Sequence, residues 1–261
     1  MQPGETAEMV SDELDTAPSK FALMMPWGRV GSNLVVSALN AAPGIRVLNE
    51  PTTVIRSKGQ SAGLTLNDIA DQQNEHLEEF IQNPPDHTAG LKLAYQSIVQ
   101  KTAYLEKMAK ADFKLVLMVR KNFLKCAISQ VRALDRAQNK AKSDQWASPW
   151  AVKMNEPKPE ATEIDIEKAI KLSDRFEALH YEMLGRVNAV FGKNYLHVEY
   201  GELVEDPEKG IRGVFSFLSR EEPESIKISH RKATSDRLQD DILNYDAFAA
   251  AIRDAGKAAY L

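Results

Sequence analysis

The sequence predicts a single-domain α/β protein in which helices flank a parallel β-sheet. Short runs of branched and aromatic residues are typical of buried strands: Phe21–Met25, Gly90–Ala94, Lys114–Val119, Tyr195–Tyr200 and, more weakly, Ile45–Leu48. Apolar residues at helical spacing follow most of these runs. Strands that alternate with helices form βαβ units, and 261 residues suffice for one large domain.

Composition excludes several classes of protein. Lys plus Arg is 33 and Asp plus Glu is 37, a formal charge of −4, which gives no general attraction to nucleic acid or to an anionic membrane. Cys126 is the only cysteine, and the five histidines show no metal-binding spacing, so neither a disulfide nor a metal is expected. With no signal peptide and no membrane span in the sequence, we expect a cytoplasmic protein.

The chain divides into a tail and a domain. Residues 1–19 are acidic and polar, and we expect a flexible tail ahead of a domain that spans 20–261. Within the domain, 138–163 contains three prolines and two tryptophans, which predicts an irregular lid or acceptor loop. Helices are expected over Ile164–Phe191, after Asp206-Pro207 and near Tyr245–Ala255. The sequence leaves the oligomeric state open.

The segment Met25–Leu34 joins a predicted strand to an amphipathic helix. Its backbone N–H groups would converge at a helix N-terminus, which favours an anion, and Arg29 adds a planar guanidinium for phosphate or sulfate oxygens. A plain strand-to-helix turn would also suit Gly28 and Gly31. The loop lacks the lysine of a Walker A motif, and a sulfuryl group carries less charge than a phosphoryl group. The loop therefore suits sulfuryl transfer better than kinase chemistry.

A second pattern places Arg120 at the end of a buried strand and Ser129 in the following helix. Both can face the same end of the sheet, where an arginine and a hydroxyl would suit a second phosphate. In the alternative interpretation, Arg120 forms a structural ion pair and Ser129 packs between helices.

Together these motifs resemble the sulfotransferases that use 3′-phosphoadenosine 5′-phosphosulfate (PAPS). They resemble in particular the bacterial branch typified by trehalose sulfotransferase and its nodulation-factor relatives. Gly28–Leu34 looks like the family's 5′-phosphosulfate loop, Arg120–Ser129 like its 3′-phosphate motif, and Leu196–Leu203 like its Tyr-Glu-Asp-Leu strand. The resemblance runs from about Phe21 to Leu261. The sequence departs from the pattern at Val30, where a serine is usual, at Trp27-Gly28 and at Gly201.

The resemblance implies a PAPS donor and no required metal. Arg29 and the backbone of the loop would hold the 5′-phosphosulfate, and the loop residues are Val30, Gly31, Ser32, Asn33 and Leu34. Arg120 and Ser129 would hold the 3′-phosphate. Further donor contacts would come from Tyr200, Arg231 and Lys232, although a solvated basic run also explains the last two.

The resemblance also implies the catalytic residues. Glu50, after the Ile45–Leu48 strand, would be the base that takes the acceptor's hydroxyl proton; a surface glutamate at a strand end is the alternative. Lys92 would neutralise the sulfonate or the leaving oxygen together with Arg29, or else would simply reach solvent from a strand end. His197 is interpreted as a core histidine.

The acceptor would be a small molecule or glycan, in particular a hydroxyl of a carbohydrate or glycolipid. Trp146 and Trp150 could stack on a sugar or anchor the loop equally well. Two other functions stay open: a P-loop small-molecule kinase, and a nucleotide-binding protein with this fold but without turnover.

Overall fold

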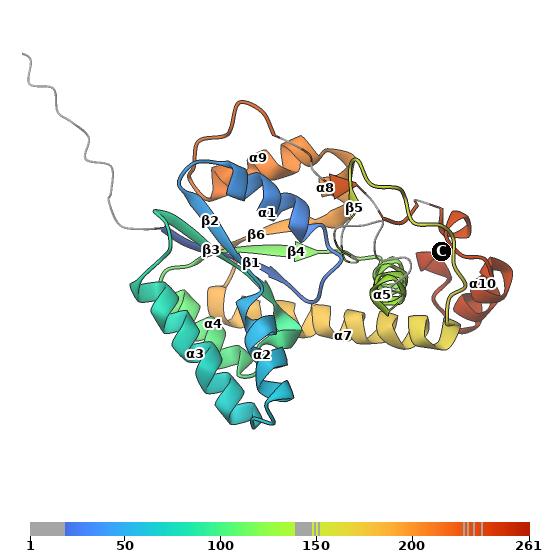
Figure 1. Ribbon diagram of the computed structural model, residues 1–261, viewed down its shortest axis with the longest axis horizontal. Helices are drawn as coiled ribbons and strands as arrows, with labels where there is room; N and C mark the ends of the chain where they lie inside the picture. The colour runs from blue at the N-terminus through green and yellow to red at the C-terminus, as the bar shows by residue number, and fades with distance from the viewer. Residues whose placement is uncertain are drawn as a thin grey trace, which may run out of the picture.

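A computed structural model describes residues 19–138, 148, 150, 152–226, 228, 230–231, 233–235 and 237–261. Its centre is a parallel five-stranded sheet in the order β2-β3-β1-β4-β6 (Figure 1). The strands are β1 (Ser19–Met25), β2 (Ile45–Asn49), β3 (Thr88–Ala94), β4 (Lys114–Val119) and β6 (Tyr195–Glu199). All five predicted strands are confirmed. The expected tail lies outside the described residues, apart from Ser19, which begins β1.

The helices surround this sheet. They are α1 (Ser32–Ala41), α2 (Pro51–Ser61), α3 (Leu66–Gln82), α4 (Lys101–Lys110), α5 (Phe123–Gln138), α7 (Ile166–Phe191), α8 (Tyr200–Glu205), α9 (Pro207–Phe217) and α10 (Tyr245–Asp254). The three predicted helices of the C-terminal half are confirmed as α7, α9 and α10. The sequence analysis placed no helix at α2, α3 or α8. Across the described residues, no helix has the length and apolarity needed to cross a membrane.

Alternate residues of β1 feed two separate cores. Leu23 and Met25 pack in the core that α1 and α9 cover, whereas Ala22 and Met24 pack in the core beneath α3, α4 and α7. Figure 1 shows these two groups of helices on opposite faces of the sheet. A sheet covered on both faces explains why its strands read as continuous apolar runs.

The strand order reverses at β1. From β1 the chain passes through α1 to β2 at one edge and returns to β3; it then crosses through α4 to β4 on the other side of β1. In open α/β sheets, ligands bind at the carboxyl ends of the strands at such a reversal. The loop after β1 occupies that place.

A smaller unit closes the carboxyl end of the sheet. Strand β5 (Val152–Lys153) pairs antiparallel with β7 (His230–Arg231), and Thr162 forms a bridge with Ile242. Arg132 of α5 forms an ion pair with Asp241 at 2.8 Å. The described part of the predicted 138–163 loop is therefore joined to the C-terminal segment, and Arg132 Nη2, which donates to the Pro159 carbonyl at 3.1 Å, joins it to α5.

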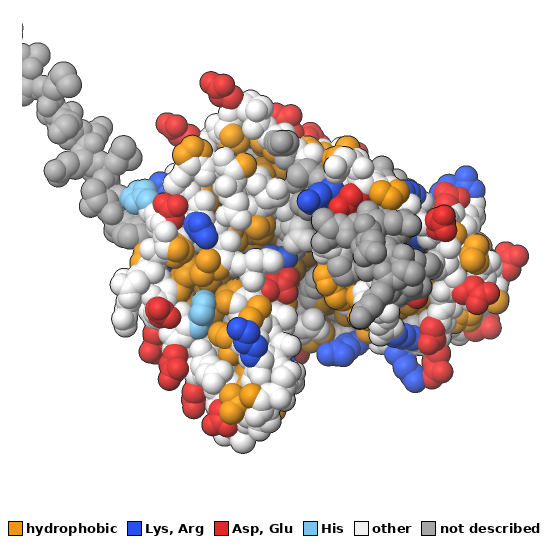
Figure 2. Space-filling model, in the orientation of Figure 1, with side chains coloured by type: hydrophobic (Ala, Val, Ile, Leu, Met, Phe, Trp, Pro, Cys, Tyr) orange, Lys and Arg blue, Asp and Glu red, His pale blue; other side chains and the backbone are white. Residues whose placement is uncertain are grey.

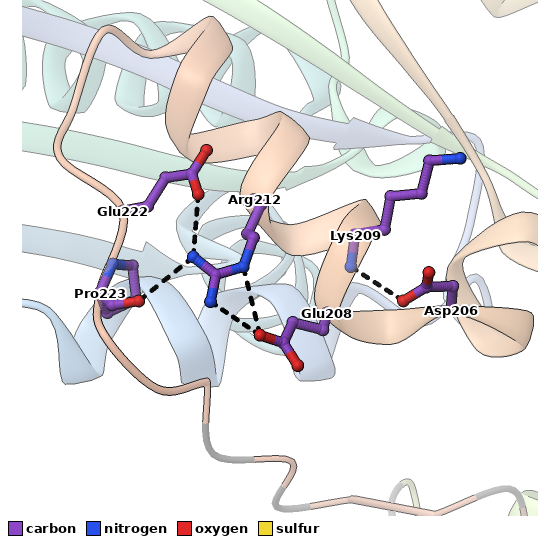
Figure 3. A network of polar contacts seen from close by, with 6 residues as sticks. All are labelled: Asp206, Glu208, Lys209, Arg212, Glu222 and Pro223. Carbon is purple, nitrogen blue, oxygen red and sulfur yellow. Dashed lines mark hydrogen bonds and ion pairs between the residues drawn. The ribbon is translucent and has the colours of Figure 1, made fainter.

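Helix α9 begins as the sequence predicts and holds the loop that follows it. The Asp206 side chain accepts a hydrogen bond from the Lys209 backbone N–H at 3.0 Å, and Pro207 is the first helical residue. Arg212 binds Glu208 and, across the turn, Glu222 and the Pro223 carbonyl (Figure 3). These contacts tie the loop after α9 to the helix.

The interpretation of His197 as a core residue is wrong. Its strand β6 lies at the edge of the sheet, and the side chain is exposed. Among the histidines whose side chains the structure describes, His180 on α7 is the buried one, and its ring centroid lies 5.4 Å from that of Phe123.

Candidate active site

The loop after β1 presents the open N-terminus of α1. Gly31 is the N-cap residue at φ 80°, no side chain of the described residues caps the helix, and the first turn has no acid. A Cβ on Gly31 would lie 3.0 Å from Leu203 and 3.2 Å from Tyr200, so only glycine fits here without displacement. Free N–H groups and the helix dipole at such a helix end favour an anion.

Arg29 lies beside this helix end and is held from two elements. Its Nε donates to Ser129 Oγ of α5 at 2.9 Å, and its Nη1 donates to the Trp150 carbonyl. Burial, followed by the positive charges of Arg136 and Arg120, lowers the pKa of Arg29 to about 10. A bound anion would offset both effects, because its negative charge stabilises the buried guanidinium and reduces the repulsion by the neighbouring arginines.

Arg120 and Tyr200 form the opposite side of the same opening. Arg120 follows β4, is only 7% exposed, and donates from Nη1 to the Arg29 carbonyl at 3.3 Å. Its guanidinium lies 4.2 Å from the centroid of the Tyr200 ring, a cation–π contact. Arg29, Arg120 and Ser129 are thus brought together, as the sequence predicts for an anion-binding end of the sheet.

Lys92 is a buried cation with two polar partners. It lies on β3 with 3% of its surface exposed, on the face covered by α1. Its Nζ donates to Asn33 Oδ1 at 2.7 Å and forms an ion pair with Glu50 Oε1 at 2.9 Å. It does not reach solvent from a strand end. Instead it links the first turn of α1 to the carboxylate that follows β2.

Glu50 is fixed by its backbone as well as by Lys92. Its N–H donates to the Lys92 carbonyl at 3.0 Å, it is the N-cap residue of α2, and Pro51 begins the helix. Its φ of 52° lies in the left-handed region, which non-glycine residues rarely adopt. The side chain is 28% exposed, and Thr53 Oγ1 donates to its Oε2 at 3.3 Å. Glu50 therefore presents a fixed carboxylate to solvent.

Two cavities meet at this loop. The smaller, about 260 Å³, contains Arg120, Ser129 and Tyr200 and has an apolar part formed by Val152, Val204, Pro207 and Ile228. The larger, about 810 Å³, contains Glu50 and Lys92. Arg29, Ser32, Asn33 and Trp150 line both cavities. A molecule in each would therefore meet at the N-terminus of α1.

The remaining predicted residues have different positions. The Val30 side chain is fully buried in the core and lines neither cavity, whereas Leu34 lines the smaller one. Trp150 is 40% exposed at the boundary between the cavities. Trp146, Lys232 and the side chain of Arg231 lie outside the described residues, although the Arg231 backbone belongs to β7.

The departure at Gly201 has a local explanation. Glu199 Oε2 accepts the Gly201 N–H at 2.6 Å and caps α8. A Cβ on Gly201 would lie 2.7 Å from that oxygen, so an acidic side chain does not fit there unless Glu199 moves.

Several residues of the larger cavity have no signal in the sequence motifs. Thr53 and Arg56 come from α2, and Arg175 comes from the long helix α7. The buried Arg136, which lowers the pKa of Arg29, is a similar case. These helices reach the site only through tertiary packing. Within the described residues, no group of three or more His, Cys, Asp or Glu side chains is arranged to hold a metal ion.

Comparison with known proteins supports the fold assignment. No family model and no curated protein match this sequence. The crystal structure of a sulfotransferase from Alicyclobacillus acidocaldarius superposes with a TM-score of 0.51 at 14% identity, covering 92% of this chain and 94% of that chain. The chain thus has a single α/β domain of the P-loop type, with a central parallel sheet flanked by helices.

Two further likenesses are weaker. The sulfotransferase domain from the curacin biosynthetic pathway gives a TM-score of 0.46 at 11% identity, covering 80% of this chain and 76% of that one. Shikimate kinase from Bacteroides thetaiotaomicron gives 0.43 at 10% identity, covering 77% of this chain and 98% of that one. At such identities, the chemistry must be argued from the site itself.

Proposed function

We propose that this protein transfers a sulfuryl group from PAPS to an acceptor hydroxyl. The observation that carries the proposal is the contact chain from Glu50 through Lys92 to Asn33, at the point where the two cavities meet. It joins a carboxylate on the acceptor side to a buried ammonium and to the anion-binding end of α1. A non-catalytic nucleotide-binding protein would not need this arrangement.

The smaller cavity suits the donor. Its apolar part would accept the adenine, and Arg120 with Ser129 would hold the 3′-phosphate. The N-terminus of α1 and Arg29 would hold the 5′-phosphosulfate, whose negative charge would offset the burial of Arg29 and its repulsion by Arg136 and Arg120. The buried Val30 side chain supports a role for its backbone only.

The transfer is an in-line displacement at sulfur. The acceptor oxygen forms a bond to sulfur while the bond between sulfur and the 5′-phosphate oxygen breaks. The acceptor's hydroxyl proton passes to Glu50, and the electron pair of the broken O–H bond stays on the oxygen that attacks sulfur. Lys92 and Arg29 neutralise the sulfonate and the leaving phosphate, so the products are a sulfate ester and adenosine 3′,5′-bisphosphate.

Phosphoryl transfer is the second candidate, because the P-loop-type fold is compatible with it. Phosphoryl transfer is disfavoured because the residue directly before Ser32 is Gly31 and not the lysine of a Walker A motif. In addition, the lysine in the cavity, Lys92, is paired with Glu50.

A thermal-shift titration tests the donor. Adenosine 3′,5′-bisphosphate should stabilise the protein by about 2.7 kcal/mol at a hundred times its Kd, and at much lower concentrations than AMP. Arg120→Gln should reduce this advantage over AMP, because only the bisphosphate has a 3′-phosphate. Stabilisation by ATP–magnesium that equals or exceeds that by the bisphosphate would instead support a kinase.

A further inference from the structure

The larger cavity is positively charged although the protein as a whole is acidic. Among the described residues that line it, the cations are Arg29, Arg56, Lys92 and Arg175, and the anion is Glu50. The whole chain has a formal charge of −4. Figure 2 shows acidic and basic side chains interspersed over one face of the molecule, so the excess of positive charge in the cavity is not shared by that face as a whole.

The proposed chemistry uses only two of these cations. Arg29 and Lys92 face the donor and Glu50, whereas Arg56 and Arg175 have no role in it. Among the described residues, no carboxylate forms an ion pair with either arginine. Arg56, half-buried on α2, donates from Nη1 to the Gln96 carbonyl at 2.6 Å. This contact fixes the guanidinium and leaves its other N–H groups available to a ligand.

Arg175 differs from its neighbours on α7. Asp174 and Glu177 both contact Lys257, at 2.7 and 3.5 Å, whereas Arg175 is exposed and lines the larger cavity. The carboxylates nearest in sequence are therefore engaged elsewhere. Arg56 of α2 and Arg175 of α7 thus each bring a positive charge to this cavity, and neither charge forms an ion pair with a described carboxylate.

The rest of the lining suits a ligand with many hydroxyl groups. Amide and hydroxyl side chains are the largest group, and they are Ser32, Asn33, Asn49, Thr53, Gln60, Gln96, Ser97, Gln130 and Ser148. The buried Trp27 and Phe176 rings, stacked with centroids 4.3 Å apart, form an apolar part of the wall. Amides donate and accept hydrogen bonds, which matches hydroxyls, and an apolar wall matches the C–H faces of a sugar ring.

We propose that the acceptor is a polyhydroxylated molecule that carries an anionic group, a carboxylate or a phosphate. Arg56 and Arg175 bind this group, and a hydroxyl of the same molecule is thereby directed to Glu50. The inference rests on the proposed function and specifies its acceptor.

The charge of the acceptor can be tested before its identity is known. A small-molecule extract of the native cells is passed over a quaternary-ammonium resin, and the retained and unretained fractions are incubated with 35S-labelled PAPS and the full-length protein. Label should enter the retained fraction. Phosphatase treatment of the extract before the column moves the acceptor to the unretained fraction if the group is a phosphate, and leaves it retained if it is a carboxylate.

Variants connect the charge to the two arginines. With the retained fraction as acceptor, Arg175→Gln and Arg56→Gln should each lower kcat/KM about tenfold, mainly through KM, since a charge-assisted contact is lost. Arg175→Lys should recover part of the loss. The matched control is Arg253→Gln, an exposed arginine on α10 outside both cavities, which should behave as wild type.

The two hypotheses fail in different ways. A protein that does not bind adenosine 3′,5′-bisphosphate contradicts the proposed function. If the protein binds adenosine 3′,5′-bisphosphate but labels only the unretained fraction, sulfuryl transfer stands and the proposal of an anionic acceptor is overturned. If Arg175→Gln and Arg56→Gln label the retained fraction as fast as wild type does, the two arginines do not bind the anionic group of the acceptor.

Discussion

Lys92 shows how a single residue connects strand, helix and chemistry. A buried ammonium is destabilising unless it is paired, and here an amide oxygen and a carboxylate both lie within 2.9 Å of it. The strand register makes this possible, because Lys92 of β3 pairs with Asn49 of β2, the residue before Glu50. Lys92 and Glu50 are therefore held in one geometry before any ligand binds.

Replacing Glu50 by glutamine tests the role of its carboxylate. The amide keeps the size and can still accept a hydrogen bond from Lys92, but it does not take up the acceptor's proton. Turnover should fall by about 10² to 10⁴, the usual contribution of general-base catalysis, while the affinity for adenosine 3′,5′-bisphosphate changes little.

The exposed Glu106 on α4 provides the matched control, since Glu106→Gln should retain wild-type turnover. A folded Glu50→Gln protein with near-normal turnover would remove Glu50 from the mechanism.

Individual side chains differ in how far the sequence reveals them. The positions of Arg29, Arg120 and Ser129 could be predicted, since Arg29 and Arg120 follow strands that are evident from apolar runs, and Ser129 lies in the helix after the second of these strands. The pairing of Lys92 with Asn33 follows from neither motif alone, because it requires the order of β3 and β1 in the sheet. His197 was misassigned for the same reason: an edge strand and a central strand have similar sequences.

Two segments far apart in sequence are joined by one buried ion pair. Arg132 and Asp241 are 2% and 1% exposed, and Arg132 Nη2 also donates to the carbonyls of Pro159 and Glu160. Asp241 in turn accepts the backbone N–H of Ser235. These contacts hold the segments that follow β5 and β7 against α5, next to the wall of the smaller cavity.

Breaking this pair should destabilise the protein strongly. Asp241→Asn leaves the Arg132 guanidinium buried without its counter-charge, which typically costs about 3–5 kcal/mol. Urea unfolding followed by circular dichroism measures the free energy of unfolding. Arg212→Ala is the comparison, since it removes the more exposed ion pairs of Figure 3 and should cost much less. Equal losses for the two variants would contradict a special role for the buried pair.

The helices show which sequence signals are sufficient. Helix α9 could be predicted from Asp206-Pro207, whereas α3 was missed although Thr65 and Asp68 form a capping box and Ile69, Leu77 and Phe80 form its buried face. That signal was readable in the sequence. The pairing of β5 with β7 was not, because two-residue strands separated by most of the C-terminal half carry no periodicity.

For the molecule as a whole, the fold was predictable and the acceptor was not. The central strands β3, β1 and β4 are buried on both faces, so their apolar runs identify the sheet directly. The larger cavity draws its walls from loops, from β2 and β3, and from helices α1, α2, α5 and α7. Its composition depends on how these elements pack, which local sequence does not determine.

Acid stability is a property of the whole molecule to which His180 should contribute. Burial, then the positive charges of His197 and Lys121, lowers the pKa of His180. As the pH falls through the ordinary histidine pKa of about 6.5, the unfolded chain takes up this proton before the folded one does, so stability is lost. His180→Leu should therefore lose less stability than wild type between about pH 7 and about pH 5.

Urea unfolding at a series of pH values measures this difference, with His87→Leu, a substitution of an exposed histidine, as control. If His180→Leu and wild type show parallel pH dependences, proton binding at His180 does not limit acid stability.

Arg29 and Glu50 share a backbone feature with a consequence for protein engineering. Both have positive φ, 74° and 52°, where a non-glycine residue typically costs about 1–3 kcal/mol. A thermostabilising library would favour glycine or asparagine at these positions, because either residue relaxes the backbone. Such changes would also remove from the cavities the guanidinium and the carboxylate to which the proposed function assigns the donor and the acceptor. Stability optimisation of this protein should therefore keep positions 29 and 50 fixed and draw its substitutions from elsewhere.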